Sequence, residues 1–267
     1  MGEPPLFRLE HGERPLIVSA PHVGLALPPG MAERLSDAAR RLPDTDFGVT
    51  ELYRDALPAG VSFLRAEFSR YVIDLNRAPD GAALYPGRFE TGLVPLFTFA
   101  GEPVWRTGME PDAEEVAQRR ERYWRPYHDA LRGEIDRLRQ RHRRVLVWEA
   151  HSIRGRLPRL FEGELPDLNL GTADGESCGP DLETALRAEL GQQREFSHVV
   201  NGRFKGGWIT RHYGRPAVGV EAVQLELRQG CFLDEDDPRY DPPRAAPLAE
   251  LLRRLLARAL AVVEESR

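Results

Sequence analysis

The sequence contains the stretch Val145-Leu-Val-Trp-Glu-Ala-His-Ser152, in which four apolar residues run directly into a polar segment. A short apolar run that does not alternate with polar residues is typical of a parallel strand buried on both faces. The stretch Pro15-Leu-Ile-Val-Ser-Ala-Pro-His22 repeats this pattern nearer the start of the chain. We therefore expect two buried parallel strands, each with a histidine just past its carboxyl end.

The rest of the chain alternates between strand and helix patterns, which favours an α/β fold. Residues 112–142 carry apolar side chains at helical spacing and predict a long amphipathic helix, kinked or restarted near Pro126. Residues 79–111 are rich in Gly and Pro and predict a long functional loop. The other expected elements are helices at 31–42, 46–56, 181–190 and 247–263 and strands at 61–67, 71–75 and 219–227. We expect a single domain, 1–267, with a mainly parallel or mixed sheet and helices on both faces.

Composition and charge exclude several classes of protein. The 267 residues carry a formal net charge of -5 and the arginines are spread along the chain, which argues against nucleic-acid binding. No apolar run approaches the roughly 20 residues of a membrane span, and the N-terminus has no signal-peptide pattern. Cys178 and Cys231 follow no metal-binding or redox spacing. We expect a cytoplasmic protein with no membrane partner, whose oligomeric state the sequence does not specify.

Two histidines at matching strand ends indicate a metal centre. A catalytic zinc site commonly takes three protein ligands, often two imidazoles and one carboxylate, and leaves a position for water. His22 and His151 are the imidazole candidates, and the acidic candidates are Asp44 and Asp46. An Asp just before a helix is ordinarily an N-cap, so we favour Asp46 as the ligand of Zn²⁺ or another divalent metal and keep Asp44 as the alternative.

The cluster Ser69-Arg-Tyr-Val-Ile-Asp-Leu-Asn-Arg77 suits an anionic ligand. Guanidinium and amide groups hold carboxylates through paired hydrogen bonds. Arg70, Asn76 and Arg77 are therefore candidates for binding a substrate carboxylate, although ion pairs with nearby aspartates would also account for the arginines.

A second cluster is Phe204-Lys-Gly-Gly-Trp-Ile-Thr-Arg-His-Tyr-Gly214, whose paired glycines permit close backbone approach to a ligand. Lys205 and Arg211 are candidates for substrate binding, and Arg211 is also a candidate for stabilising a developing oxyanion. We expect His212 to have a structural role or to support the site from behind.

Glu221 and Glu226 interrupt an otherwise apolar predicted strand, and a buried carboxylate needs a partner or a task. If Glu226 faces the metal site, it can take a proton from the attacking water and return it to a leaving amine. Glu221 is expected to pair with an arginine. A serine nucleophile is disfavoured because Ser152 and His151 are neighbours on a strand and point to opposite faces, and because the chain has no Gly-x-Ser-x-Gly elbow.

These motifs, in this order, resemble the N-formylglutamate amidohydrolase family. The resemblance runs nearly from end to end and also includes Pro21-His-Val-Gly24, Pro43-Asp-Thr-Asp46, His151-Ser-Ile-Arg154, Pro158-Arg-Leu-Phe-Glu-Gly163, Asn169-Leu-Gly-Thr172 and Gln224-Leu-Glu226. It implies a zinc-carboxypeptidase-like fold and hydrolysis of N-formyl-L-glutamate, a small acidic N-acyl amino acid, to formate and L-glutamate in histidine breakdown. It also implies a late-strand Glu, here Glu226, as general base. In related families the acidic zinc ligand follows the first histidine by three residues, a position that Leu25 occupies here.

Three residues depart from what the family leads us to expect, namely Phe47 for Trp, Glu149 for Asp and Phe232 for Tyr. Glu149 would change the support behind His151, and Phe232 removes a hydroxyl. Two other functions stay open at this point. A hydrolase of the same fold acting on another N-acyl amino acid or a peptide would have a large, open pocket. A non-catalytic binding protein for acidic amino acids would need no stoichiometric zinc.

Overall fold

The computed structural model describes residues 4–83 and 90–265, and seven strands among them form one sheet. The strands lie side by side in the order β1-β3-β2-β4-β7-β5-β6. Their bounds are β1 Phe7–Glu10, β2 Leu16–Ala20, β3 Ser62–Ala66, β4 Val145–Ile153, β5 Leu168–Gly171, β6 His198–Val200 and β7 Val220–Arg228.

The four central strands of the sheet are parallel, and the strands that flank them run in the opposite direction. Strands β3, β2, β4 and β7 run parallel to one another, whereas β1 is antiparallel to β3 and β5 is antiparallel to β7. At the far edge, β6 pairs in parallel with β5. The expectation of a mixed, mostly parallel sheet is confirmed.

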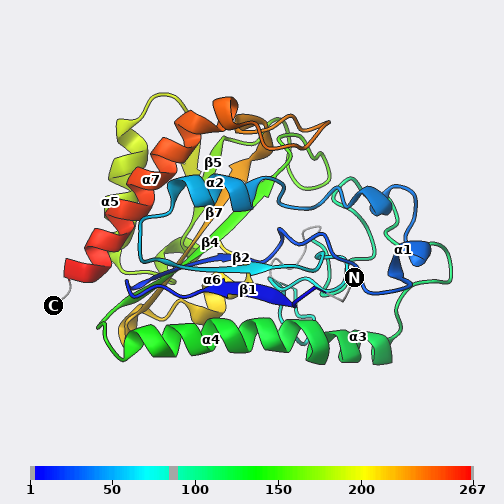
Figure 1. The fold of residues 1–267 in the computed structure, drawn as a ribbon. Coiled ribbons are helices and arrows are strands. Elements are labelled where there is room, and N and C mark those ends of the chain that lie inside the picture. The colour runs from blue at the N-terminus through cyan, green and yellow to red at the C-terminus, as the bar shows by residue number, and fades with distance from the viewer. Residues whose placement is uncertain (1–3, 84–89, 266–267) are drawn as a thin grey trace.

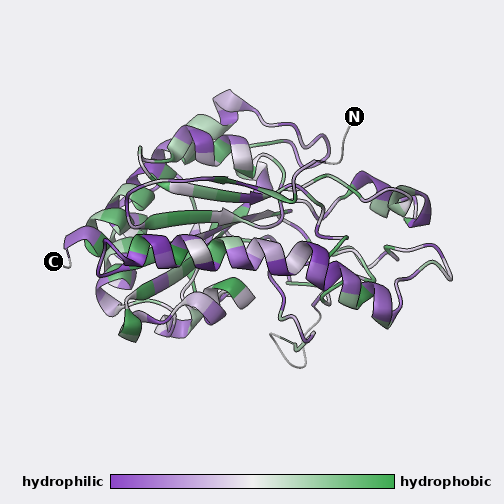
Figure 2. Cartoon of the chain, turned by 60° about the horizontal axis from the view of Figure 1, so that its bottom comes forward, coloured by the Kyte–Doolittle hydropathy of each residue, from purple (hydrophilic) through white to green (hydrophobic). Residues whose placement is uncertain are grey.

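Helices cover both faces of the sheet, as predicted (Figure 1). Helices α2, α5 and α7 lie on one face, and α4 and α6 lie on the other. Figure 2 shows the strands as largely hydrophobic behind the mixed surface of the long α3–α4 helix. None of the helices in the described parts of the chain is long and apolar enough to cross a membrane. The helical bounds are α1 Met31–Arg34, α2 Val49–Ala56, α3 Ala113–Arg119, α4 Arg125–Arg139, α5 Pro180–Gln192, α6 Trp208–Tyr213 and α7 Pro242–Glu265.

Alternate residues of β4 supply the two hydrophobic cores. Leu146, Trp148 and Ala150 belong to the core under α2, α5 and α7, whereas Val145 and Val147 belong to the core under α4. Side chains alternate across a strand, so the polar residues 149 and 151 point to the α4 side. The same alternation on β7 places residues 224 and 226 on that side.

Strand β4 is longer than its apolar run predicts. It continues through Ile153 because every residue from Val145 onward pairs with β7, so that His151 lies inside the strand beside Glu226. The predicted long helix does restart near Pro126. A π-helical segment, Arg120–Trp124, joins α3 to α4, and Pro126, which has no N–H to donate, is the second residue of α4.

Two predicted elements are wrong. The segment 71–75 is not a strand, because Asp74 there directs its carboxylate to the backbone N–H of Asn76 and its own N–H to the carbonyl of Leu93. The predicted helix at 31–42 is only α1 plus a 3₁₀ turn, Ala39–Arg41, since Leu35 between them forms a bridge to Trp105. The sequence patterns do not predict β1, β5, β6 and α6, all of them six residues or shorter. Part of the predicted 79–111 loop, residues 84–89, lies outside the described residues.

Candidate active site

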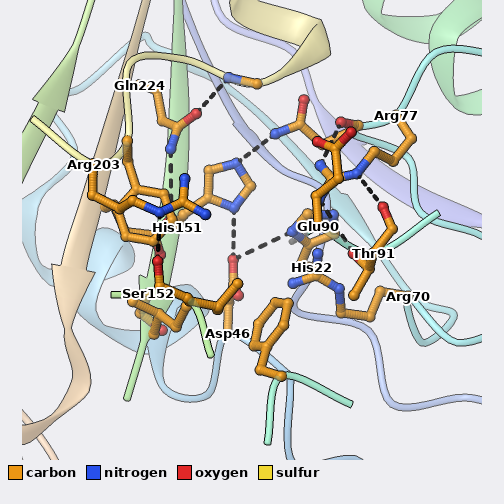
Figure 3. Close-up of a pocket in the computed structure, with 17 residues that line it drawn as sticks. His22, Asp46, Arg70, Arg77, Glu90, Thr91, His151, Ser152, Arg203 and Gln224 are labelled. Atoms are coloured by element: carbon orange, nitrogen blue, oxygen red, sulfur yellow. Dashed lines mark hydrogen bonds and ion pairs between the residues drawn. The ribbon is translucent and has the colours of Figure 1, made fainter. Parts of the chain in front are cut away.

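A small cavity of about 80 Å³ lies at the carboxyl ends of the central strands. Side chains from β4, β7 and the segments after β2 and β3 line it. Figure 3 shows them converging from both sides on His22, Asp46 and His151. Such crevices beyond parallel strand ends are where α/β sheets bind ligands.

Two histidines and one aspartate come together at the floor of the cavity. The ligand atoms of His22, Asp46 and His151 all lie within 4.8 Å of one another, and the three side chains are buried. Asp46 Oδ2 is 2.8 Å from Nδ1 of His151 and 3.8 Å from Nδ1 of His22. Helix α2 begins only at Val49, after Gly48 in the left-handed region (φ 70°), so Asp46 precedes the helix and is free to face the histidines.

A carboxylate lies behind each imidazole. Nε2 of His22 is 2.7 Å from Asp74 Oδ1, and Nε2 of His151 is 2.7 Å from Glu149 Oε1. A proton on Nε2 is held by the carboxylate, which leaves Nδ1 directed at the shared space. This pairing is the usual way in which a metal-binding histidine is fixed.

The two imidazoles differ in their electrostatic surroundings. Burial and the charge of Arg70 lower the pKa of His22. Burial opposes protonation of His151 as well, but the Glu149 and Asp46 carboxylates outweigh it and raise the pKa of His151 well above its ordinary value. Burial likewise opposes ionisation of Asp74, yet His22 and Arg70 hold the pKa of that carboxyl well below its usual range.

Asp44 is engaged elsewhere. Its Oδ2 accepts hydrogen bonds from the Tyr71 hydroxyl at 2.8 Å and from the Phe99 N–H at 3.0 Å. Burial raises the pKa of Asp44 to about 6, and Arg70 offsets only part of this effect. The geometry therefore favours Asp46 over Asp44 as the acidic partner of the two histidines.

Glu226 reaches the same cavity from β7, directly beside His151 in register. It is buried, and this burial raises the pKa of its carboxyl, an effect that the charge of His151 only partly reduces. Gln224, two residues earlier on the same face, donates from Nε2 to Glu226 Oε2 at 3.4 Å. A buried carboxylate with a raised pKa beside a possible metal site is suited to exchanging a proton near neutral pH.

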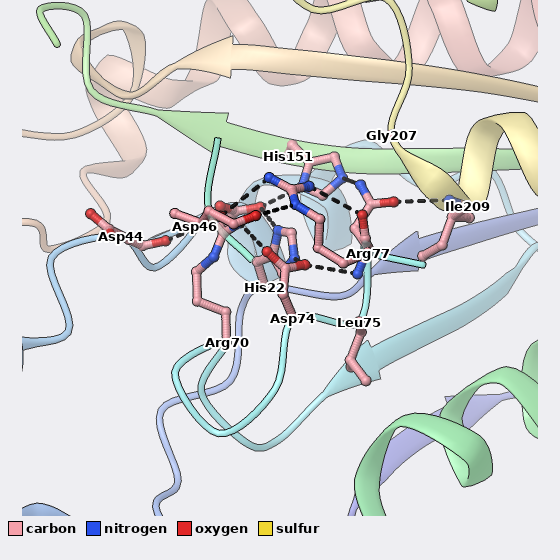
Figure 4. A network of polar contacts seen from close by, with 12 residues as sticks. His22, Asp44, Asp46, Arg70, Asp74, Leu75, Arg77, His151, Gly207 and Ile209 are labelled. Carbon is pink, nitrogen blue, oxygen red and sulfur yellow. Dashed lines mark hydrogen bonds and ion pairs between the residues drawn. The ribbon is translucent and has the colours of Figure 1, made fainter. Parts of the chain in front are cut away.

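Three guanidinium groups line the cavity, and local contacts hold each of them in place. Arg70 donates from Nη2 to Asp74 at 2.7 Å (Figure 4). It also stacks over Phe99, with 4.7 Å from its guanidinium carbon to the ring centroid. Arg77 donates from Nε to the carbonyl of Thr91 at 2.8 Å and from Nη2 to the Thr91 hydroxyl at 3.2 Å. In Figure 3, Arg203 lies on the other side of His151 and Asp46 from Arg70 and Arg77.

The structure does not bring two of the predicted substrate-binding residues into the cavity. Lys205 donates from Nζ to Asp174 at 2.9 Å, and Arg211 is exposed on α6, where its Nε donates to the carbonyl of Gly206. Neither side chain lines the cavity. Arg203 lines the cavity and is not among the residues that the sequence predicts for the site. It directly precedes the Phe204–Gly214 cluster, and this position is the signal that could have identified it.

Other residues singled out in the sequence have structural roles. Glu221 pairs with Arg144 at 2.9 Å, as expected, and His212 stacks on Trp208 with 4.1 Å between ring centroids. Phe232 is fully buried in the core under α2 and α7 and does not line the cavity. The Ser152 hydroxyl accepts a hydrogen bond from Gln229 at 3.2 Å, which gives no support to a serine nucleophile.

Comparisons with known proteins agree on one family. The model of the N-formylglutamate amidohydrolase family matches residues 14–233. The chain is 48% identical to N-formylglutamate deformylase of Pseudomonas putida over 257 residues, 96% of each chain. It is 47% identical to N-formylglutamate deformylase of Pseudomonas aeruginosa, over 94% of this chain and 96% of that one. The crystal structure of N-formylglutamate amidohydrolase from Ralstonia eutropha is similar with a TM-score of 0.83 at 26% identity, covering 98% of this chain and 99% of that chain.

Proposed function

The chain belongs to the N-formylglutamate amidohydrolase family, and we propose that it hydrolyses N-formyl-L-glutamate to formate and L-glutamate. The observation that carries this proposal is one small cavity that holds two different sets of groups. A buried His-Asp-His group and a buried glutamate face the same space as three guanidinium groups. The first set suits hydrolysis of an amide, and the second suits an acidic substrate. Histidine degradation is the process that this reaction would serve.

We assign the metal to His22, Asp46 and His151. Two imidazole nitrogens and one carboxylate oxygen, all within 4.8 Å, are a donor set that suits zinc and leaves room for water or substrate. When bound, the metal supplies Lewis-acid polarisation of the formyl carbonyl and of the attacking water, and a positive charge that favours the ionised form of Glu226. The carboxylates of Asp74 and Glu149 keep the two imidazoles in orientation.

Glu226 carries the proton in this proposal. Its carboxylate takes a proton from water as the water oxygen attacks the formyl carbon, and it then delivers that proton to the amide nitrogen. The C–N bond breaks, formate leaves with the water oxygen, and L-glutamate leaves with its amino group. The hydrogen bond from Gln224 fixes the carboxylate for both transfers.

Arginines bind the two carboxylates of the substrate. Arg70 and Arg77 line the cavity, and hydrogen bonds to Asp74 and Thr91 hold their guanidinium groups in place. Arg203 approaches from the other side and is anchored through its Nε at 2.7 Å from the carbonyl of Leu160. The small volume of the cavity favours a formyl group over a larger acyl group.

The test is a release assay on zinc-loaded protein with N-formyl, N-acetyl and N-succinyl glutamate and with N-formyl aspartate. We expect the highest kcat/KM for N-formylglutamate. Arg77→Met should raise KM strongly, whereas Arg125→Met, whose guanidinium pairs with Glu121 on the surface, should leave it unchanged. A higher kcat/KM for N-acetyl or N-succinyl glutamate would replace the proposed substrate, and a metal-free protein with full turnover would remove the metal from the proposal.

A further inference from the structure

The short helix α6 has its first N–H groups bonded to side chains of three distant segments. Gly207, the residue at its N-cap, offers no side chain to bond them. Instead the N–H of Gly207 donates to Gln224 Oε1 at 2.7 Å, and that of Ile209 donates to Asn76 Oδ1 at 2.9 Å. Both the N–H, at 3.1 Å, and the hydroxyl of Thr210 donate to Glu149 Oε2. The first turn of a helix leaves such N–H groups without partners in the helix, and here residues of the candidate active site supply the acceptors.

Each of these three acceptors also contacts a group of the reaction centre. Gln224 donates to Glu226, and Glu149 lies 2.7 Å from Nε2 of His151. Asn76 places its amide nitrogen 3.1 Å from the same Nε2, in contact with the imidazole that Glu149 holds. The side chains that accept hydrogen bonds from the start of α6 therefore also contact His151, the proposed metal ligand, and Glu226, the proposed base.

Close packing keeps this arrangement rigid. A Cβ at Gly207 would lie 2.1 Å from the amide nitrogen of Asn76, and Gly206 has a φ of 121°, which only glycine adopts without strain. Thr210 and Glu149 are fully buried, so no water competes for their contact. Buried hydrogen bonds to a charged oxygen are stronger than neutral ones and fix the acceptor's orientation.

We propose that Thr210 is a positioning residue of the metal centre, acting on His151 through Glu149. This inference rests on the proposed function, because it assigns His151 to the metal. The backbone N–H and the hydroxyl of Thr210 both donate to Oε2 of Glu149. The Glu149 carboxylate therefore presents Oε1 to Nε2 of His151, which keeps Nδ1 of the imidazole directed toward Asp46. Without the hydroxyl, the carboxylate keeps only the backbone N–H on that oxygen and can rotate away from the imidazole.

The experiment compares Thr210→Val, Thr210→Ser and Thr172→Val. Valine keeps the shape of threonine and removes the hydroxyl, and serine restores the hydroxyl. Thr172 is the matched control, because it is also buried and its hydroxyl donates to a glutamate, Glu183, at 2.8 Å with no connection to His151. For each variant we would measure zinc affinity by competition with a chelator, kcat and KM for N-formylglutamate, and the free energy of unfolding of the metal-free protein.

We expect Thr210→Val to lower zinc affinity about 10-fold or more, the effect typical of losing support behind a metal-binding histidine. Its kcat should fall while its KM stays within about 2-fold, and Thr210→Ser should recover both zinc affinity and kcat. Thr172→Val should change stability without changing zinc affinity. Equal zinc affinity in Thr210→Val and Thr172→Val, or a wild-type chain that binds no zinc, would overturn the positioning role. Zinc affinity is measured without substrate, so a loss confined to Thr210→Val supports the positioning role even if N-formylglutamate is not turned over.

Discussion

Replacing Asp74 by asparagine should weaken both the fold and the metal centre. Asp74 is fully buried, lies 2.7 Å from His22 Nε2 and accepts a hydrogen bond from Arg70 at 2.7 Å. Asp74 also accepts a hydrogen bond from the N–H of Asn76 at 2.8 Å. An asparagine side chain would have one acceptor oxygen for these three donors and no charge to balance the buried guanidinium. Breaking a buried ion pair costs about 3–5 kcal/mol. Because asparagine keeps the volume and one oxygen, we expect a loss near the lower end, about 3 kcal/mol, in the free energy of unfolding.

The same substitution removes the carboxylate behind His22, so zinc affinity should fall about 10- to 100-fold. Stability would be measured by urea unfolding of chelator-treated protein, and zinc affinity by chelator competition. Asp181→Asn is the control, since Asp181 pairs with Arg144 at 2.6 Å while 52% of its side chain is exposed. Exposed pairs of this kind contribute about 0–1 kcal/mol. An Asp74→Asn variant that is no less stable than Asp181→Asn and binds zinc as tightly as the wild type would refute both roles of Asp74.

Three further predictions concern other parts of the molecule. Asp46→Asn should lose stoichiometric zinc and Asp44→Asn should keep it, as metal analysis after dialysis would show; the opposite result would make Asp44 the ligand. Burial opposes ionisation of the Glu134 carboxyl, but hydrogen bonds with Arg137, Ser62 and His11 outweigh this effect and lower the pKa of Glu134 to about 2. A carboxyl with a lowered pKa stabilises the fold above its ordinary pKa and loses this effect as pH falls toward the folded-state value. Glu134→Gln should therefore cost about 1–3 kcal/mol at neutral pH, and urea titrations should show this difference shrinking below about pH 4.5; a constant difference would contradict the assignment. Leu131→Ala in the core under α4 should cost about 2–5 kcal/mol in the same urea assay, and a cost under about 1 kcal/mol would mean that this core is loosely packed.

Periodicity and strand-end position correctly predicted the central strands and the residues that meet at their carboxyl ends. The unbroken apolar runs of β2 and β4 identified the two central strands, and the residues that follow or end them, His22 and His151, do meet at the carboxyl edge. The position of Glu226 in an apolar strand indicated a buried carboxylate, and the structure places it in the cavity. These inferences succeeded because parallel strands place their carboxyl ends together whatever the loops do.

The sequence did not predict the directions of side chains in the loops. The cluster around the paired glycines makes Lys205 and Arg211 candidates for substrate binding, but in the structure Arg203 lines the cavity and these two residues do not. The direction of a side chain in such a loop depends on backbone angles that composition does not reveal. The sequence also allows ion pairs between the arginines and nearby aspartates, and Arg70 does pair with Asp74. The sequence does not show that this pair is buried.

The same limit applied to the support behind the histidines. In the sequence, Glu149 stands out only as a departure from the family pattern. The hydrogen bonds that join it to Thr210 connect residues 61 positions apart. Contacts of this kind arise from the packing of α6 on β4 and β7, and α6 is too short to be recognised by periodicity. The sequence therefore indicated which residue types carry the chemistry better than it indicated what holds them in place.

The central claim, that Glu226 transfers the proton in a metal-dependent hydrolysis of N-formylglutamate, is tested most directly by one comparison. Formate release would be measured for zinc-loaded wild-type protein and for Glu226→Gln at matched zinc content. General acid–base catalysis typically contributes about 10²- to 10⁴-fold, so the variant should bind zinc normally and lose at least about 99% of kcat. A variant that binds zinc and releases formate at the wild-type rate would contradict the account.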